Sequence, residues 1–348
     1  MDYRSHAINL NWTAEEKLEL FRQMVRIRRF EQKALLYYQA SQMAGWLFLS
    51  IGQELVAAGV RSIMRENDHS ISGNRGLGHA LAAGMEMGPC MAEFFGKTNG
   101  ASKGKAGAFS FYAPQHHHWG CHGIAAAHTP IAAGLAFGLK QQEIKGAVFC
   151  FLGEGSVNQG VYHESLNLAG LFNLPVVYVI ENNGYAMGTS LRRSSAFRDF
   201  LARRAEAYDI EWDALSDDDP YELRARVHQA AERARNQQRP TVLEISTYRY
   251  HGFTIADPNH QKYRTSEEIN AHKARDPIRL WLLHLESEGI ASASLLEKIS
   301  LDAKSEAQVA VKFAQSGEFP LVSEIQQDVY WESDHQTDAS KFGRHFFE

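Results

Sequence analysis

Apolar residues at helical spacing follow Thr13 near the start of the chain. They recur at positions 18, 20, 21, 24, 25, 27 and 30, so they fall on one face of a helix. Thr13 and Glu16 have the spacing of a capping box, in which each side chain bonds the other residue's backbone N–H. The pattern predicts a long helix from residue 14, and a second helix from about Gln53 through Val60.

Three short, continuous apolar runs in the middle of the chain predict strands. They span residues 147–152, 175–180 and 241–245. A helical pattern at about 159–172 separates the first two runs, and another at about 221–236 precedes the third. Strand, helix, strand is the order of a βαβ unit, whose strands are parallel and covered by helices on both faces. The sequence therefore predicts an α/β fold with a parallel sheet and helical N- and C-terminal extensions.

The regions on either side of these runs differ from them. Residues 66–125 are rich in glycine and histidine, which predicts ordered loops with short helices around Pro89–Phe95. Such a long loop region in a compact domain is typical of a binding surface. Beyond a polar loop at 247–264, helices are predicted from Asp276-Pro277 through Leu285 and over about 293–314.

Composition and charge narrow the class of protein. The chain has 348 residues, a formal net charge of −5 and no long basic run, so we expect neither nucleic acid nor a membrane surface as a partner. The longest apolar region, 124–139, is shorter than the roughly 18–20 residues of a membrane span. Cys90, Cys121 and Cys150 form an odd, sparse set, for which we expect buried free thiols in a reducing cytoplasm. The first residues show no apolar signal core, which also favours a cytoplasmic location.

Polar and glycine residues follow both central strands. Gly153-Glu154-Gly155-Ser156 ends the first run, and Asn182-Asn183-Gly184-Tyr185 ends the second. In open parallel sheets ligands bind beyond the carboxyl ends of the strands, where glycines let the backbone approach a phosphate. A carboxylate and an amide oxygen from adjacent strand ends can hold a hard cation such as Mg²⁺. The residues thus predict a metal-bridged diphosphate, with a simple strand-to-helix turn as the alternative.

Other ligand motifs fit the sequence less well. The phosphate-binding pattern Gly-x-x-x-x-Gly-Lys-Ser/Thr does not occur, and the dinucleotide pattern fails because the next glycine after Gly155 is Gly160. His116-His117-His118 with Cys121 and His122 matches no tetrahedral zinc spacing. Zinc and nicotinamide sites are therefore disfavoured.

The segments around Glu154 and Asn183, 29 positions apart, resemble the thiamine diphosphate motif. The surrounding sequence is similar to the alpha subunit of the decarboxylating component of 2-oxoacid dehydrogenase complexes, with the pyruvate and acetoin members nearest. The resemblance covers roughly residues 15–330. Further matching segments occur in the same order: Ile51–Glu54, Lys103–Gly107, Gly123-Ile124, Tyr248–Gly252 and Tyr263–Glu268.

The resemblance implies a role for particular residues. Metal ligands are implied at the Glu154 and Asn183 side chains and at the Tyr185 backbone carbonyl, with Mg²⁺ as the metal and Ca²⁺ or Mn²⁺ as alternatives. His251 matches a loop histidine near the diphosphate and the reacting centre, and is the implied catalytic residue. The other implied cofactor-binding positions are Asn74, Arg75, Gly123, Ala125, Gly153, Gly155 and Ser156.

The resemblance also implies a reaction and partners. The thiazolium ring of the cofactor accepts electrons when carbon dioxide leaves a 2-oxoacid, and the acyl fragment passes to a lipoyl group on an acyltransferase. A glutamate needed beside the aminopyrimidine belongs to a beta subunit, so an α2β2 heterotetramer is implied. We expect a single domain over 1–348, with N-terminal helices at 1–65, a cofactor-binding core at 66–265 and C-terminal helices and a tail at 266–348.

Several positions depart from the family pattern. Glu154 stands where aspartate is usual, and Asn74 replaces a tyrosine. Phe48 and Phe253 stand where histidines are frequent, and a Gly-Ser-Met-His segment is replaced by Gly107-Ala108-Phe109-Ser110. These changes favour a less polar or larger substrate, or a weakened catalyst. Two alternatives therefore stay open: a carboligase or decarboxylase with a non-lipoyl acceptor, and a catalytically silent paralogue that supports a partner subunit. Thr254 falls where some members have a phosphorylated serine.

Overall fold

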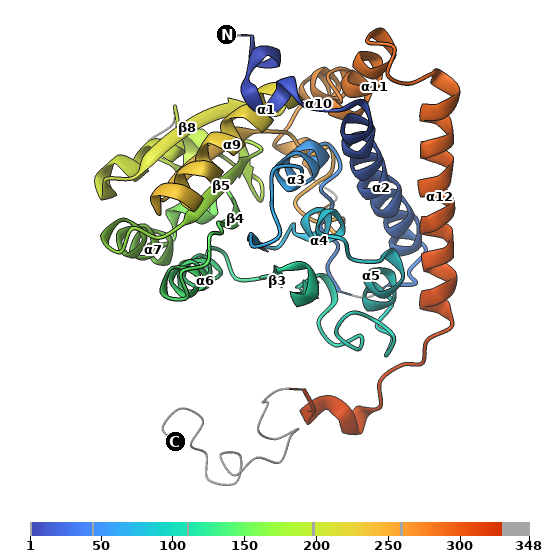
Figure 1. Cartoon of the computed structure of the whole chain (residues 1–348). Helices are drawn as coiled ribbons and strands as arrows, with labels where there is room; N and C mark the ends of the chain where they lie inside the picture. The colour runs from blue at the N-terminus through green and yellow to red at the C-terminus, as the bar shows by residue number, and fades with distance from the viewer. Residues whose placement is uncertain (1, 44, 110, 197–198, 258–259, 329–348) are drawn as a thin grey trace.

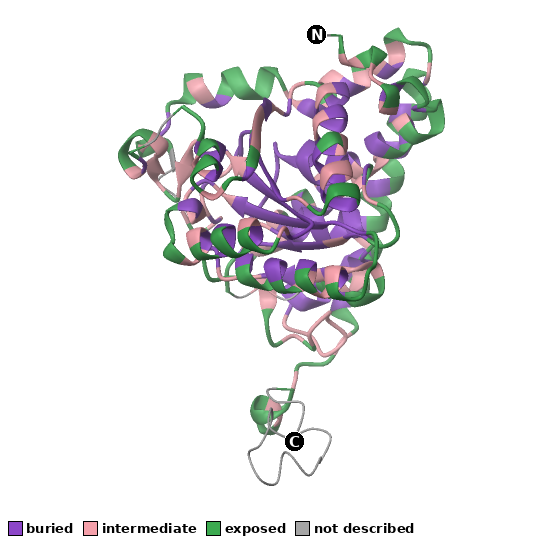
Figure 2. Cartoon of the chain, turned by 60° about the vertical axis from the view of Figure 1, so that its left-hand side comes forward, coloured by how far each residue is buried: buried purple, intermediate pink, exposed green. Residues whose placement is uncertain are grey.

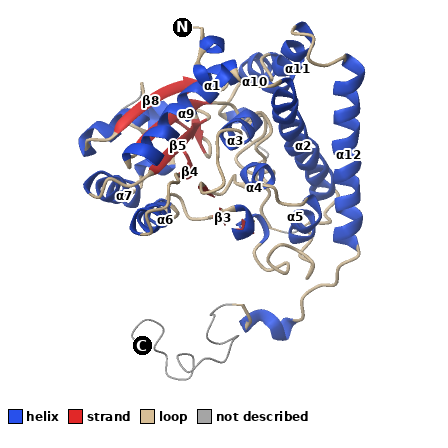
Figure 3. Ribbon diagram, in the orientation of Figure 1, coloured by secondary structure: helices blue, strands red, loops and turns tan. Residues whose placement is uncertain are grey.

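The computed structural model describes residues 2–328 except 44, 110, 197–198 and 258–259. A seven-stranded sheet forms its centre, and helices pack on both sides of it (Figures 1 and 3). The spatial order of the strands is β2 (Tyr112–Ala113), β3 (His118–Cys121), β1 (His69–Ser72), β4 (Val148–Gly153), β5 (Val176–Asn182), β9 (Thr241–Ser246) and β8 (Glu211–Ser216). Within this sheet every pairing is parallel except that of β2 with β3. The predicted α/β fold class is confirmed.

Helices surround this sheet in chain order. They are α1 (Ala7–Leu10), α2 (Ala14–Gln39), α3 (Glu54–Arg61), α4 (Leu77–Ala83), α5 (Met87–Phe94), α6 (Thr129–Gln141), α7 (Gly160–Leu171), α8 (Leu191–Ser194), α9 (Pro220–Gln237), α10 (Ser266–Ala274), α11 (Pro277–Ser287) and α12 (Ala293–Gln315). A separate two-stranded sheet pairs β6 (Tyr185–Ala186) with β7 (Thr189–Ser190). The predicted capping box at the start of α2 is present, with Thr13 and Glu16 bonding each other's backbone N–H.

The central strands are apolar throughout because both of their faces are covered. Phe149 and Val177 point to one side, into a core shared with α2, α3, α9 and α11. Their neighbours Cys150 and Tyr178 point to the other side, into a core with α6 and α7. The alternation follows from the two-residue period of a strand. Figure 2 shows the buried sheet between helices whose outer surfaces are exposed.

A third core fills the space between α4, α5, α12 and the C-terminal half of α2. Ile27 and Phe30 of α2 meet Met91 of α5 and Val311 of α12 there. In Figure 1, α12 runs along the outer side of α2 and α5. The cores thus contain residues from the predicted segments 1–65, 66–265 and 266–348. The single-domain division itself stays a prediction, and residues 329–348 lie outside the described part of the chain.

One region was predicted only in part. The short helix near Pro89 is present as α5, but residues 66–125 also contain α4 and strands β1 and β3. These strands are polar: Ser70 of β1 bonds the Nδ1 of His118 on β3 at 2.9 Å, and both residues are buried. Because polar side chains satisfy one another inside the sheet, no apolar run marks these strands in the sequence. The structure also adds β8 and α10.

Candidate active site

A cavity of about 290 Å³ lies beyond the carboxyl ends of β4 and β5. Its walls come from the turns after β1, β4 and β5, from residues 123–125 and from the loop after β9. The predicted site residues on its lining are Asn74, Arg75, Gly123, Ala125, Gly153, Glu154, Gly155, Ser156, Asn183 and Tyr185. All predicted site residues except His251 therefore meet at one cavity, while their roles toward a cofactor stay predictions.

Strand register brings the two predicted metal ligands together. Gly153 of β4 lies beside Glu181 of β5 in the parallel pair, so the residues after both strands emerge at the same edge. The backbone N–H of Asn183 points to the Oε2 of Glu154 at 3.4 Å. The Oδ1 of Asn183 accepts from the Tyr185 N–H at 3.3 Å, and its Nδ2 donates to Gln53 Oε1 at 3.4 Å. Glu154, Asn183 and Gln53, each with a side-chain oxygen, thus lie next to one another on the cavity lining.

Burial sets the electrostatics of Glu154. The residue is only 3% exposed, and burial raises the pKa of its carboxyl group, against the opposing effects of backbone N–H groups and of Arg249 and Arg75. A hard cation beside this carboxylate would favour its charged form. Carboxylate, amide and carbonyl oxygens are the donors that Mg²⁺ and Ca²⁺ take in proteins. The donor set therefore fits the metal implied by the sequence.

Arg75 supplies a buried positive charge on the same cavity. Its guanidinium donates to the Leu49 carbonyl and, at 3.0 Å, to the Phe253 carbonyl. Burial and the neighbouring Arg249 lower the pKa of Arg75 to about 10. Carbonyl oxygens hold this cation in place but do not neutralise it. An anion in the cavity would stabilise the charged form, so the site suits a diphosphate.

Two glycines allow the turn after β4 and the turn after β5 to approach each other. A Cβ atom on Gly155 would lie 2.6 Å from the Cβ of Ala186 in β6, so glycine is the residue that this contact admits. Gly184 has a φ of +84°, a left-handed conformation that glycine adopts without strain. Together they place Tyr185 and Ala186 against the turn that follows β4.

The structure places His251 away from this cavity. Arg249 and Arg264 hold its carbonyl oxygen at 2.8 and 2.7 Å. The residue lines a different cavity, beside Arg28 and Tyr250. The loop residue that does line the first cavity is Phe253. The catalytic role of His251 stays a prediction, and the cavity lining gives it no support.

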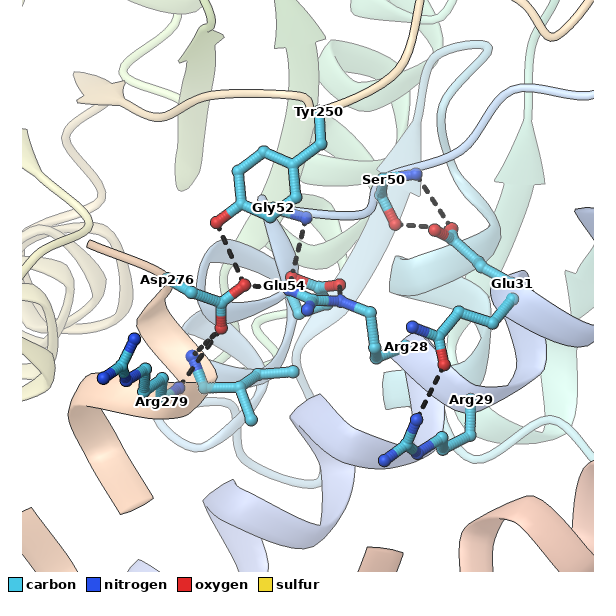
Figure 4. A network of polar contacts seen from close by, with 11 residues as sticks. Arg28, Arg29, Glu31, Ser50, Gly52, Glu54, Tyr250, Asp276 and Arg279 are labelled. Atoms are coloured by element: carbon cyan, nitrogen blue, oxygen red, sulfur yellow. Dashed lines mark hydrogen bonds and ion pairs between the residues drawn. The ribbon is translucent and has the colours of Figure 1, made fainter. Parts of the chain in front are cut away.

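A buried polar network supports the segment that precedes α3 (Figure 4). Arg28 of α2 pairs with Glu54 and, at 2.9 Å, with Asp276 before α11. Glu54 accepts from the Gly52 N–H at 2.9 Å, and Tyr250 donates to Asp276 at 3.0 Å. The network fixes residues 50–54, and Gln53 projects from this segment toward Asn183.

Some lining residues were not predicted as site residues. They are Gln53, Gly73, Phe151, Leu152, Glu181, Ala186, Met187 and Phe253. Glu181 is held by His79 of α4, with 3.2 Å between Oε2 and Nε2. The hydroxyl group of Tyr185 donates to Glu268 of α10 at 3.0 Å. Gln53 and Glu268 belong to segments that match the family, so the resemblance was the available signal for them.

Other sequence predictions can be checked against the described residues. The three cysteines are free and buried, as predicted. Within the described chain, no group of three or more His, Cys, Asp or Glu side chains is placed so that it could hold a metal ion. No helix of the described chain combines the length and apolar character needed to cross a membrane.

Comparison with known proteins agrees with this site. Residues 22–323 match the family model described as dehydrogenase E1 component. The chain belongs to the dehydrogenase E1 component family. A protein of Rickettsia felis named pyruvate dehydrogenase E1 component subunit alpha is 38% identical over 91% of this chain and 97% of its own length. The proteins of the same name from Rhizobium meliloti and Zymomonas mobilis are each 37% identical, over 91% and 90% of this chain and 91% and 88% of their own lengths.

Membership of the E1 family confirms the main functional predictions. The chain is an E1 alpha-type component of a thiamine-diphosphate-dependent 2-oxoacid dehydrogenase. The name of these relatives describes an alpha subunit, which is one part of an E1 component.

Proposed function

We propose that this chain is the alpha subunit of an α2β2 pyruvate dehydrogenase-type enzyme, located in the cytoplasm. It would decarboxylate pyruvate or a related 2-oxoacid and transfer the acyl group to a lipoyl acceptor. One observation supports this most directly. The oxygens of Glu154 and Asn183 and the buried cation of Arg75 line the same cavity at the ends of two parallel strands.

The residues have distinct roles in this proposal. Glu154, Asn183 and the Tyr185 carbonyl would hold Mg²⁺, and Arg75 with the backbone N–H groups of Gly155 and Ser156 would bind the diphosphate. Asn74, Gly123, Ala125 and Gly153 would complete the binding surface. The resemblance implies that His251 acts at the reacting centre, but its side chain lines a different cavity, so the proposal gives it no role in holding the cofactor. Bound thiamine diphosphate supplies an electron sink for decarboxylation.

The longer side chain of Glu154 affects which metal ion fits the site. Its side chain is longer by one methylene than the usual aspartate, a difference of roughly 1.5 Å. Mg²⁺ requires nearly ideal octahedral geometry, whereas Ca²⁺ accepts a wider range. The donors fit Mg²⁺ chemically, with Ca²⁺ or Mn²⁺ as alternatives that a titration separates.

The test uses the chain purified with the beta subunit that accompanies it. A panel of 2-oxoacids is assayed with an artificial electron acceptor, with and without thiamine diphosphate and Mg²⁺. We expect turnover that requires both, and its loss in Asn183→Ala but not in Asn236→Ala, an exposed asparagine on α9. An intact complex that neither binds the cofactor tightly nor turns over any acid would instead support the silent paralogue. Turnover with an aldehyde acceptor but no transfer to a lipoyl domain would support the carboligase.

A further inference from the structure

Three phenylalanines from separate parts of the chain meet beside the active-site cavity. The ring of Phe48 lies 5.2 Å from that of Phe253 and 5.6 Å from that of Phe109, centre to centre. Phe48 is 4% exposed and lies behind Phe253, which lines the cavity. Phe109 reaches toward Gly123, where an added Cβ would lie 3.0 Å from its ring. Ser110, at the end of that segment, lies outside the described residues.

The cavity therefore has two chemically different parts. Glu154, Arg75 and Asn183 make one part strongly polar. Phe253 and Met187 make the other part apolar, and Phe48 and Phe109 extend the apolar wall behind it. None of these four side chains can donate or accept a proton at neutral pH.

A second cavity, of about 410 Å³, continues beyond the apolar part. Phe253 and Met187 line both cavities and so stand between them. Trp46 and Tyr263 add aromatic rings to the second cavity, and Trp46 stacks on Phe48 at 5.8 Å. The Tyr263 hydroxyl donates to Asp257 at 2.7 Å, so it already has a polar partner within the chain. The space beyond Phe253 thus combines the rings of Trp46, Phe253 and Tyr263 and the side chain of Met187 with two polar residues, Thr254 and Asp257.

We propose that Phe253, supported by Phe48 and Phe109, is the residue that selects the side chain of the 2-oxoacid. The proposal rests on the proposed function and names its substrate class. The preferred substrates are 2-oxoacids with a branched aliphatic or aromatic substituent, and pyruvate is a poor one. Burial of a larger apolar group against these rings is favourable in proportion to its area, whereas the methyl group of pyruvate covers little of them.

The expected preference for larger 2-oxoacids over pyruvate follows from the energetics of hydrophobic pockets. A single methylene in a hydrophobic pocket changes kcat/KM by roughly 10–200-fold. A branched four-carbon substituent should therefore exceed the methyl group of pyruvate by at least about tenfold. Replacement of Phe253 by histidine introduces a polar ring at the wall and should reverse much of this preference. Arg75 bonds only the backbone carbonyl of residue 253, so cofactor affinity should change little.

The experiment measures kcat/KM of the alpha–beta holoenzyme for 4-methyl-2-oxopentanoate, phenylpyruvate and pyruvate. We expect at least one larger acid to exceed pyruvate tenfold or more. Phe253→His should lower that ratio at least tenfold, while Phe253→Leu, which keeps an apolar wall, should retain the preference for 4-methyl-2-oxopentanoate. Phe319→His, at an exposed phenylalanine, is the control for the substitution itself.

The outcomes separate this proposal from the proposed function. Efficient turnover in which wild type prefers pyruvate would overturn the substrate class and leave the proposed function intact. If Phe253→His keeps the wild-type ratio of kcat/KM values, the substrate class is likewise overturned and the proposed function stays intact. Absence of thiamine diphosphate binding and of turnover with every acid would overturn both proposals together.

Discussion

Replacement of Gly155 by alanine should disturb the cofactor site through a single steric contact. The new Cβ would lie 2.6 Å from the Cβ of Ala186, a separation that real Cβ atoms do not adopt. Gly155 has ordinary backbone angles, φ −70° and ψ −30°, so alanine adds no backbone strain. The contact is relieved if β6 or the Gly155 turn moves, and β6 contains Tyr185, the predicted carbonyl ligand.

The magnitude follows from the cost of overpacking. Insertion of a methyl group into a well-packed contact costs about 1–3 kcal/mol. Without a cofactor, β6 can move aside, so we expect most of the cost to fall on cofactor binding. At about 1.4 kcal/mol per tenfold change, the affinity for thiamine diphosphate should fall roughly 5- to 150-fold.

A double-mutant cycle gives the test its control. Ala186→Gly removes the opposing Cβ, so Gly155→Ala combined with Ala186→Gly should recover most of the lost affinity. Gly160→Ala, where the nearest atom is 3.8 Å away, should bind the cofactor normally. Calorimetric titration of the alpha–beta complex with thiamine diphosphate and Mg²⁺ measures each affinity. The reasoning is refuted if Gly155→Ala binds like wild type, or if the second substitution restores nothing.

Three further predictions concern other buried charges. Burial raises the pKa of Glu31 to about 7, so its contribution to stability is fully present below about pH 4.5 and is lost as the pH rises through 7. Glu31→Gln should remove this decline, worth about 3 kcal/mol, in thermal melts across pH; an unchanged pH profile would contradict it. Asp68→Asn removes the fully buried carboxylate that pairs with Arg235 and leaves that cation only the partly exposed Glu232, so it should cost about 3–5 kcal/mol in urea unfolding. Asp302→Asn, in an exposed pair, should cost under about 1 kcal/mol; equal losses would refute the difference. Arg75→Gln should weaken cofactor binding at least tenfold by titration, and unchanged affinity would remove Arg75 from the site.

The sequence predicted well those elements whose buried faces require apolar residues, because these residues leave a pattern along the chain. β4 and β5 are buried on both faces, so their apolar runs nearly coincide with the strands. α2 has a side-chain cap and one apolar face, so its start was also predictable. β1 escaped prediction because Ser70 is satisfied by His118, a partner 48 positions away. Pairings at that distance along the chain leave no local pattern.

The candidate site likewise contains residues that the sequence could predict and residues that it could not. Glu154, Gly155 and Asn183 follow directly after predicted strands, so their meeting at one edge could be inferred from parallel topology. The loop after β9 has no such periodicity. Which of its residues faces the cavity depends on Arg249 and Arg264, which hold the His251 carbonyl while Phe253 lines the cavity. The resemblance suggested His251 as the catalytic residue and identified Phe253 only as a departure from the family pattern. The fold shows that Phe253 lines the cavity and that His251 does not.

Metal-dependent binding of thiamine diphosphate tests the central claim most directly. The alpha–beta complex is titrated with the cofactor in Mg²⁺ and again after chelation, for wild type, Glu154→Gln and Glu66→Gln, an exposed control. We predict tight binding that needs the metal in wild type and in Glu66→Gln, and at least tenfold weaker binding in Glu154→Gln. Equal affinity with and without metal, or in Glu154→Gln and wild type, would contradict the assignment of this cavity as the site of a metal-bound diphosphate.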